Sequence, residues 1–203
     1  MLERSRRGKA VAAPGFVVTA ALAIINSSVG GGVSNAGAIA AISANGGAQG
    51  IIIDAAIITG GIANTGKITA SGSGFVTGIS IEPGTVAGGI SNGGTITVTS
   101  MNGHADGFFV SGSVTGGIVN NGVITSTNST AQAFGIRIGA STSSSFEHGI
   151  FSGGIANSGT ITATGKTGTG IAILGASTVS GGVSNTGVIN VSGAQTANGI
   201  RAR

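Results

Sequence analysis

The chain of 203 residues is long enough for one domain with a substantial core, and its 41 glycines follow no Gly-X-Y triplet, which excludes collagen. A hydrophobic content of 40% is too high for a disordered Gly/Ser linker, and the lack of cysteine excludes disulfides and thiolate metal sites. Most of the net charge of +4 comes from residues 4–9 and 201–203, so no basic patch is predicted and nucleic acid is not an expected partner.

Residues 1–30 precede the first clear repeat, and the sequence leaves two interpretations of them open. In the first, residues 4–9 are the basic region, residues 10–20 the apolar region and Ala21-Leu22-Ala23 the cleavage site of a signal peptide. Pro14-Gly15 interrupts the apolar region, which is unusual for such a signal. This interpretation predicts export and removal of residues 1–23.

The second interpretation of residues 1–30 is a degenerate N-terminal coil of the repeat that follows. Gly8 precedes Gly37 by 29 residues, which equals the first interval between repeats. Leu22-Ala23-Ile24 also holds the position that Ile51-Ile52-Ile53 holds one repeat later. Terminal repeats of stacked architectures are often atypical, so a weakened first copy is a reasonable expectation.

Six copies of one motif, Gly-Gly-(Ile/Val)-x-Asn-x-Gly-x-Ile, occupy residues 31–203. Their starting positions are separated by 29, 28, 28, 37 and 28 residues. Each copy is followed by a glycine with an apolar-x-apolar triplet, and an apolar residue stands just before each Gly pair. The motif asparagines are Asn35, Asn64, Asn92, Asn120, Asn157 and Asn185.

Each repeat therefore holds three short segments in which apolar and polar residues alternate. Alternation with a period of two is typical of half-buried strands, and glycine this frequent would oppose helices. Three strands and three turns per repeat predict an all-β fold, a right-handed parallel β-helix with three sides and about 28 residues per coil. One repeat cannot bury enough apolar surface alone, so the coils must stack.

Stacking predicts files of equivalent side chains about 4.8 Å apart. The motif asparagines are expected at a turn, where their amides bond from coil to coil in a structural ladder. The glycine two residues after each asparagine suits a positive φ. The last motif position predicts an inward aliphatic file of Ile39, Ile68, Ile96, Ile124, Ile161 and Ile189.

The run Gly-Gly-Ile-Ala-Asn-Ser-Gly-Thr-Ile-Thr at residues 153–162 and its five sister copies resemble the passenger repeats of bacterial autotransporters and related haemagglutinin-like β-helix proteins. The resemblance covers about residues 31–203. It implies an extracellular, adhesin-like, non-enzymatic protein at the cell surface, with a host surface or a glycan as partner.

Proteins of this group end in an outer-membrane barrel, which is their link to the membrane, whereas this sequence ends within a coil at Arg203. The chain is therefore expected to be either a fragment or a short open-ended solenoid. A bare last coil exposes strand edges, which predicts end-to-end self-association.

An alternative function is predicted from one outward surface. The positions five and seven residues after each motif asparagine carry mostly Thr and Ser, which predicts a flat, uncharged array. Such an array resembles the ice-binding faces of β-solenoid antifreeze proteins, so ice or glycan binding is the second hypothesis. Its residues are Thr69, Thr97, Thr99, Thr125, Thr127, Thr162 and Thr164.

Parallel β-helices also include polysaccharide lyases and hydrolases, which makes an enzyme the third and least favoured hypothesis. Asp54 and Glu82 each lie four residues after a triplet glycine, so they are expected on adjacent coils, and paired carboxylates can act on sugars. No Arg, Lys or aromatic residue accompanies them in sequence, so they are interpreted as solvated turn residues. His104 and Asp106 are too isolated for a metal site. No catalytic residue, cofactor or metal is predicted.

The 37-residue repeat contains an insertion, placed at residues 139–148. Insertions in solenoids form loops that often lie on the binding face. A tolerated polar loop is the simpler interpretation. If the loop makes a specific contact, the expected residues are Phe146, Glu147 and His148.

Overall fold

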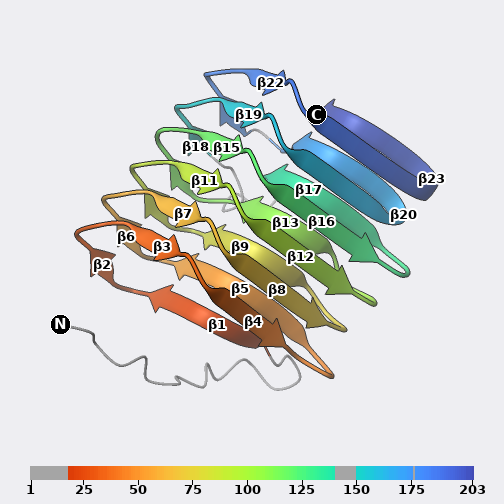
Figure 1. Cartoon of the computed structure of the whole chain (residues 1–203), viewed down its shortest axis with the longest axis horizontal. Helices are drawn as coiled ribbons and strands as arrows, with labels where there is room; N and C mark the ends of the chain where they lie inside the picture. The colour runs from red at the N-terminus through yellow and green to blue at the C-terminus, as the bar shows by residue number, and fades with distance from the viewer. Residues whose placement is uncertain (1–17, 140–149, 176) are drawn as a thin grey trace.

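The computed structural model describes residues 18–139, 150–175 and 177–203, and every regular element in these ranges is a β-strand. The strands wind into coils that stack along one axis (Figure 1). Most of the predicted signal sequence, residues 1–17, lies outside the described residues, so the choice between signal peptide and coil for residues 1–30 stays a prediction. The described part contains no helix that could span a membrane.

Each full coil contains four strand positions in a fixed order. There are four and not three because each copy of the Gly-Gly motif contains one short strand and the start of a second. The first position is a short strand that ends at the motif asparagine: β3 (Val33–Asn35), β7 (Ile62–Asn64), β11 (Ile90–Asn92), β15 (Ile118–Asn120), β19 (Ile155–Asn157) and β22 (Val183–Asn185). The second position holds β4 (Ala38–Ile42), β8 (Lys67–Gly72), β12 (Thr95–Ser100) and β16 (Val123–Asn128).

The third position holds the strands that follow the triplet glycine or include it: β1 (Val18–Ile25), β5 (Gly47–Asp54), β9 (Val76–Glu82), β13 (Ala105–Val110) and β17 (Gln132–Ile138). In the last two coils the second and third positions merge into the long strands β20 (Thr160–Ile173) and β23 (Val188–Ala202). The fourth position holds β2 (Ser28–Val29), β6 (Ile57–Ile58), β10 (Thr85–Val86), β14 (Ser113–Val114), β18 (Ile150–Phe151) and β21 (Thr178–Val179).

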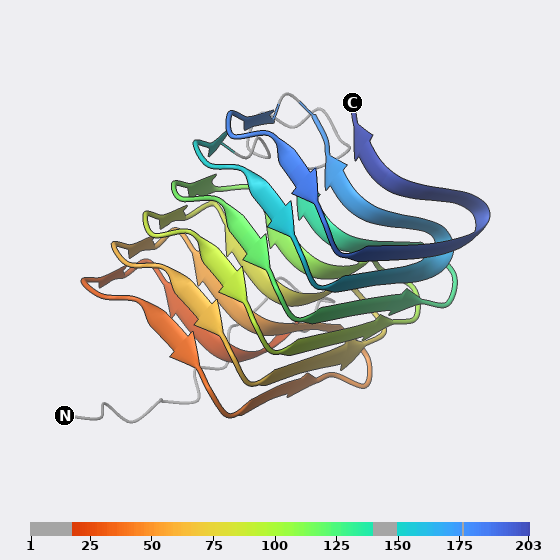
Figure 2. The same ribbon diagram turned by 45° about the horizontal axis from the view of Figure 1, so that its top comes forward.

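Equivalent strands of neighbouring coils pair in parallel and form three sheets. The first and fourth positions each make a six-stranded sheet, and the second and third positions share an 11-stranded sheet because β20 and β23 run through both. Within each sheet, equivalent strands of successive coils lie side by side along the axis, as the tilted view of Figure 2 shows. The predicted all-β, three-sided parallel β-helix is confirmed.

The coils pair in register by motif position. Asn92 lies between Asn64 in one neighbouring coil and Asn120 in the other. Asn120 in turn pairs with Asn157, so the register is kept across the 37-residue repeat. The predicted loop insertion, with its contact residues Phe146, Glu147 and His148, lies almost wholly outside the described residues.

The first described strand joins the same stack. Leu22 of β1 pairs with Ile51 of β5, and Ile24 pairs with Ile53. Both isoleucines of β5 are fully buried, and both partners in β1 pack against the core. The third-position sheet therefore begins one coil before the first motif copy.

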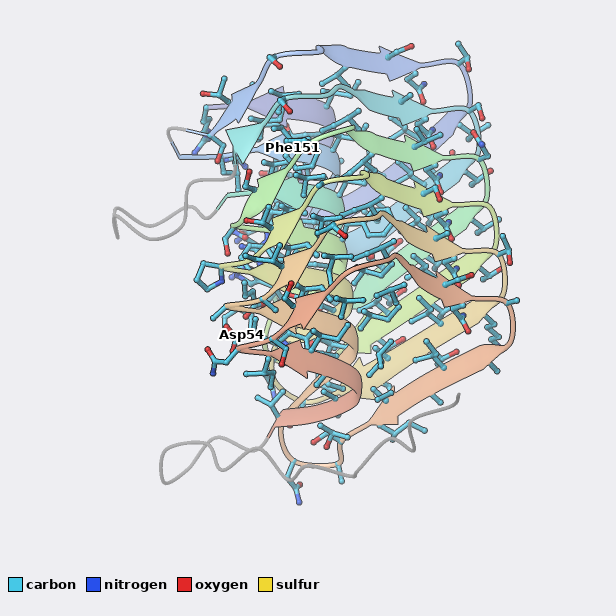
Figure 3. The ribbon with its side chains drawn as sticks, turned by 90° about the vertical axis from the view of Figure 1, so that its left-hand side faces the viewer. Asp54 and Phe151 are labelled. Atoms are coloured by element: carbon cyan, nitrogen blue, oxygen red, sulfur yellow. The ribbon has the colours of Figure 1, made fainter. Side chains whose placement is uncertain are left out.

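Branched aliphatic side chains and a few phenylalanines fill the interior. The central members of the predicted inward file, Ile68, Ile96, Ile124 and Ile161, are fully buried, and its end members pack against the same core. Phe151 points into this core, whereas Asp54 points outward (Figure 3). Each coil therefore buries apolar side chains against its two neighbours, as the stacking argument requires.

The motif glycine two residues after each asparagine is needed for close approach between coils. A Cβ on Gly66 would lie 2.0 Å from the carbonyl oxygen of Gly37, and one on Gly94 would lie 2.0 Å from that of Gly66. The expectation of a positive φ at this position is wrong. Positive φ occurs instead in the Gly pair, as at Gly89 and Gly117, both with φ near 78°.

The six motif asparagines stand in single file. The side-chain Nδ2 of each donates to Oδ1 of the asparagine in the next coil, over 2.7–2.8 Å, through five consecutive bonds. Each Nδ2 also faces the carbonyl of the motif glycine in its own coil, as at 3.3 Å from Asn92 to Gly94. A carbonyl only accepts, so this contact fixes which amide atom is nitrogen.

Asn92→Ala should be strongly destabilising. Asn64 Nδ2 and Asn120 Oδ1 would both lose a ladder partner inside the protein, and leaving a buried polar atom unpaired costs about 1–3 kcal/mol. The free energy of unfolding, measured in urea, is expected to fall by about 2–4 kcal/mol.

The matched control is Asn121→Ala, because Asn121 is the neighbouring exposed asparagine of the next coil. Its loss should change the free energy of unfolding by no more than about 0.5 kcal/mol. Equal effects of the two substitutions would contradict a stabilising ladder.

Candidate functional site

One outward surface carries the residues that differ most from coil to coil, and we call it the variable face. It is formed by the outward side chains of β5, β9, β13 and β17 and of the C-terminal halves of β20 and β23. Phe108 and Val110 lie in the core and Phe109 between them points outward, as alternation along a strand requires. Ala105 also lies in the core, so the alternation is interrupted at Gly107 and Asp106 points outward with Phe109. Two of its files are Gln49, Thr77, Asp106, Phe134, Thr169 and Asn198, and Ile52, Ser80, Phe109, Arg137, Ala172 and Arg201.

All three carboxylates of the described residues, Asp54, Glu82 and Asp106, belong to the variable face. The face carries acidic side chains on its N-terminal coils and arginines, including Arg137 and Arg201, on its C-terminal coils. Elsewhere the coils repeat one another, as the asparagine ladder does. Positions that change between repeats are free of the stacking constraint, and recognition in repeat proteins uses such positions.

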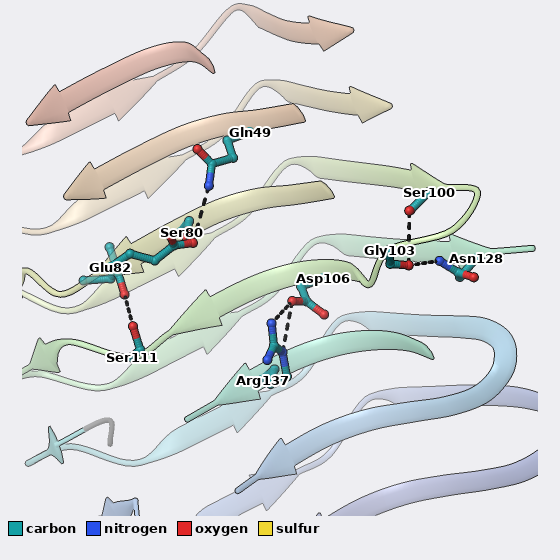
Figure 4. Close-up of polar contacts among 10 residues, drawn as sticks. Gln49, Ser80, Glu82, Ser100, Gly103, Asp106, Ser111, Asn128 and Arg137 are labelled. Atoms are coloured by element: carbon teal, nitrogen blue, oxygen red, sulfur yellow. Dashed lines mark hydrogen bonds and ion pairs between the residues drawn. The ribbon is translucent and has the colours of Figure 1, made fainter. Parts of the chain in front are cut away.

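A buried ion pair lies at the centre of the variable face. Arg137 Nε donates to Asp106 Oδ2 over 3.0 Å, and Nη2 donates to the same oxygen over 2.5 Å (Figure 4). The guanidinium also lies 3.9 Å from the centroid of the Phe109 ring and 5.4 Å from that of Phe134. Asp106 is fully buried and Arg137 is 5% exposed, so each charge depends on the other in a site with little water.

Removing one partner of this ion pair should cost more than removing both. Arg137→Met leaves the Asp106 carboxylate buried without a counter-charge, and breaking a buried pair in this way costs about 3–5 kcal/mol. In the double variant Asp106→Leu with Arg137→Met, the free energy of unfolding should recover most of that loss.

Lys67→Met is the control for the loss of one positive charge, because Lys67 is exposed on a different surface. It should change the free energy of unfolding by no more than about 0.5 kcal/mol. Strictly additive losses in the double variant would show that the two side chains are not coupled.

The predicted carboxylate pair is found on adjacent coils, since Asp54 of β5 lies opposite Glu82 of β9. Glu82 accepts hydrogen bonds from Ser80 and, over 3.4 Å, from Gln49. Burial raises the pKa of Glu82, the Ser80 hydrogen bond and Arg137 lower it, and Asp54 and Asp106 raise it again, with a net upward shift. The expectation that no cation accompanies these carboxylates is wrong, because Arg137 acts on Glu82.

Glu82 should make stability depend on pH. A raised pKa means that the folded protein holds the Glu82 proton more tightly than the unfolded chain does. Stability is therefore lost as pH rises from the ordinary value of 4.5 through the raised folded value. Relative to the wild type, Glu82→Gln should gain free energy of unfolding across that window, measured in urea from about pH 3 to about pH 7. A constant difference over this range would contradict the assignment.

His104 joins the variable face through its ring contacts. Its centroid lies 5.0 Å from that of Phe75, edge to face, and 5.8 Å from that of Phe134. Burial lowers the pKa of His104, and Asp106 partly opposes this. His104 Nδ1, Asp106 Oδ1 and Thr77 Oγ1 are buried without a hydrogen-bond partner. Among the described residues, no three His, Cys, Asp or Glu side chains group as metal ligands would.

The second outward surface is the Thr/Ser face, on β8, β12, β16 and the N-terminal half of β20. Thr97 lies between Thr69 and Thr125, and Thr99 lies between Ser71 and Thr127, all in register. Thr162 and Thr164 continue the two files. These side chains are half-buried or exposed, so the threonines form in-register files on the surface, and the flatness of the array stays a prediction.

The sequence alone did not single out Arg137, Phe109, Phe134 or Gln49. Arg137 and Phe109 occupy the middle position of the apolar-x-apolar triplet, which points outward because its neighbours point inward. Reading that position from coil to coil would have placed Arg137 beside Phe109. The ion pair with Asp106 also needs the lateral register of the coils, which sequence spacing gives only approximately.

The fold places this chain in the class of parallel β-solenoids. Beyond that class, no family model, no curated protein and no solved structure matches it. The residues of the chain and their geometry are therefore the basis for inferring its function.

Proposed function

We propose that the chain is a non-enzymatic structural or adhesive solenoid of the autotransporter-passenger type, displayed at the bacterial cell surface. The observation that carries this proposal is the asparagine ladder, which repeats the same bond through all six motif copies. A unit that stacks on copies of itself makes a scaffold whose length is set by the number of copies. Such a scaffold suits a stalk that holds a contact surface away from its anchor.

The variable face would supply the adhesive contact. Phe75 is 50% exposed at its edge, and Gln49 and His104 are partly exposed nearby. Aromatic rings beside amide and imidazole groups suit a polar partner with apolar patches, such as a glycan on a host surface.

The contacts of the acidic side chains support a non-enzymatic role. Asp106 is held by Arg137, and Glu82 is held by Ser80 and Gln49, so both carboxylates are engaged within the protein. A glycosidase needs two carboxyl groups that flank a sugar and are free to exchange protons with it. These contacts favour recognition over hydrolysis.

Display on cells tests the proposal. The chain, fused between a signal peptide and an autotransporter barrel, should reach the surface of a Gram-negative host, where added protease cleaves it. These cells should adhere to a mucin-coated surface more than cells that display the barrel alone. Phe75→Ser should lower adherence, because it removes the exposed ring of the variable face, and Thr97→Lys on the other face should not. Retention inside the cell, or display without a gain in adherence, would contradict the proposal.

A second candidate function, ice binding by the Thr/Ser face, is favoured by the in-register threonine files. A measurement of thermal hysteresis on the purified chain distinguishes ice binding from a stalk function. An ice-binding protein would show thermal hysteresis that is lost when Thr97→Lys and Thr162→Lys are combined, whereas a stalk would show none in either form.

A further inference from the structure

A polar pocket of about 400 Å³ lies where the C-terminal end of the variable face meets the last two coils. Three coils build its wall: Gln132 comes from β17, Thr167 from β20, and the remaining residues from β23 and the position after it. In register, Thr167 lies between Gln132 and Thr196. The polar lining residues are Gln132, Thr167, Thr196, Asn198, Arg201 and Arg203.

The lining combines two guanidinium groups with amide and hydroxyl groups and contains no Asp or Glu side chain. Arg201 Nε and Asn198 Nδ2 have no hydrogen-bond partner, and neither does Thr169 Oγ1, whose residue pairs with Asn198. Burial and the nearby charge of Arg203 both lower the pKa of Arg201. Two like charges are therefore held close together, and no acidic side chain of the described residues lines the pocket beside them.

Arg137, two coils earlier on the same file, shows what such a group requires. Arg137, Ala172 and Arg201 are consecutive members of that file, and Arg137 is paired with Asp106 while no Asp or Glu side chain lines the pocket of Arg201. The small side chain of Ala172 separates the two arginines. An incoming acid group would give Arg201 the counterpart that Asp106 gives Arg137.

We propose that this pocket binds the carboxylate of an acidic sugar, in a glycan that carries uronic or sialic acid units. The planar guanidinium matches a planar carboxylate and can hold both of its oxygens. Gln132, Asn198, Thr167 and Thr196 surround the two arginines with groups that bond sugar hydroxyls. The inference deepens the proposed adhesive function by naming a ligand class and a second contact on the variable face.

Titration calorimetry on the purified full chain tests the pocket. Trigalacturonate should bind, with a Kd below about 1 mM, and the same trisaccharide with methyl-esterified carboxyls should not. Arg201→Met should weaken the binding of trigalacturonate by about 10- to 100-fold, and Arg201→Lys, which keeps the charge but loses the planar fork, should also weaken it. Inorganic sulfate at equal ionic strength should not compete.

Lys67→Met is the matched control, because it removes the same charge from an exposed residue on the Thr/Ser face. Equal weakening by Lys67→Met and Arg201→Met would overturn the proposal in favour of general charge attraction. Binding of the methyl ester, full competition by sulfate, or no binding of trigalacturonate would also overturn it. If Arg201→Met lowers the unfolding midpoint, Arg203→Met, an exposed member of the lining, provides the same comparison in a folded protein.

These results are separable from those of the display experiment. The calorimetry uses soluble protein and needs neither export nor a barrel, so failed display leaves the pocket standing. If trigalacturonate does not bind, the proposed acidic-sugar site is wrong, but the proposal of a stalk that adheres through Phe75 and its neighbours is unaffected.

Discussion

A parallel solenoid holds together only when each coil lies in register on the next, because its strands find their hydrogen-bond partners in neighbouring coils. Register fixes most of the repeated residues. The asparagines must meet amide to amide, the isoleucines must form continuous inward files, and the motif glycines must leave room for a carbonyl of the adjacent coil. A side chain at Gly66 would force two coils apart and break all of these contacts together.

At positions that this register does not constrain, the residues differ from coil to coil. On the variable face, Asp106 and Arg137 form a buried pair, and Glu82 is largely buried near Asp54 and Asp106. Arg201 lies in a pocket that no Asp or Glu side chain lines. Groups of this kind reduce stability unless a partner compensates them. The asparagine ladder and the apolar core supply stability that offsets the cost of these groups. Such an arrangement, with a uniform interior and a variable surface, suits a scaffold that is recognised by another molecule.

The fold could be predicted from the sequence because its determinants repeat. Six motif copies, four of whose five spacings are 28 or 29 residues, and the alternation around them were enough for the all-β class, the three sheets and the single file from Asn35 to Asn185. The motif glycine was expected for a positive φ, whereas it is required for the close approach of the neighbouring coil. That distance between coils cannot be read from the sequence. Asp106 and Arg137, 31 residues apart, each occur once, so no repetition marked them. Asp106 pairs in register with Phe134 of the next coil, and Arg137 lies three residues further along the same strand. The ion pair is therefore diagonal, and the repeat length alone does not predict it.

The amide ladder also gives the rod an electrical direction. Every asparagine nitrogen points towards the C-terminal coils and every side-chain oxygen towards the N-terminal ones, since each donates to its successor. The individual dipoles therefore add along the axis instead of cancelling. Neutral side chains thus make the two ends of the ladder unlike, since Asn35 Oδ1 ends it on the N-terminal side and Asn185 Nδ2 ends it on the C-terminal side. The stack therefore has a built-in polarity that needs no charged residue, because all six members of the ladder are uncharged.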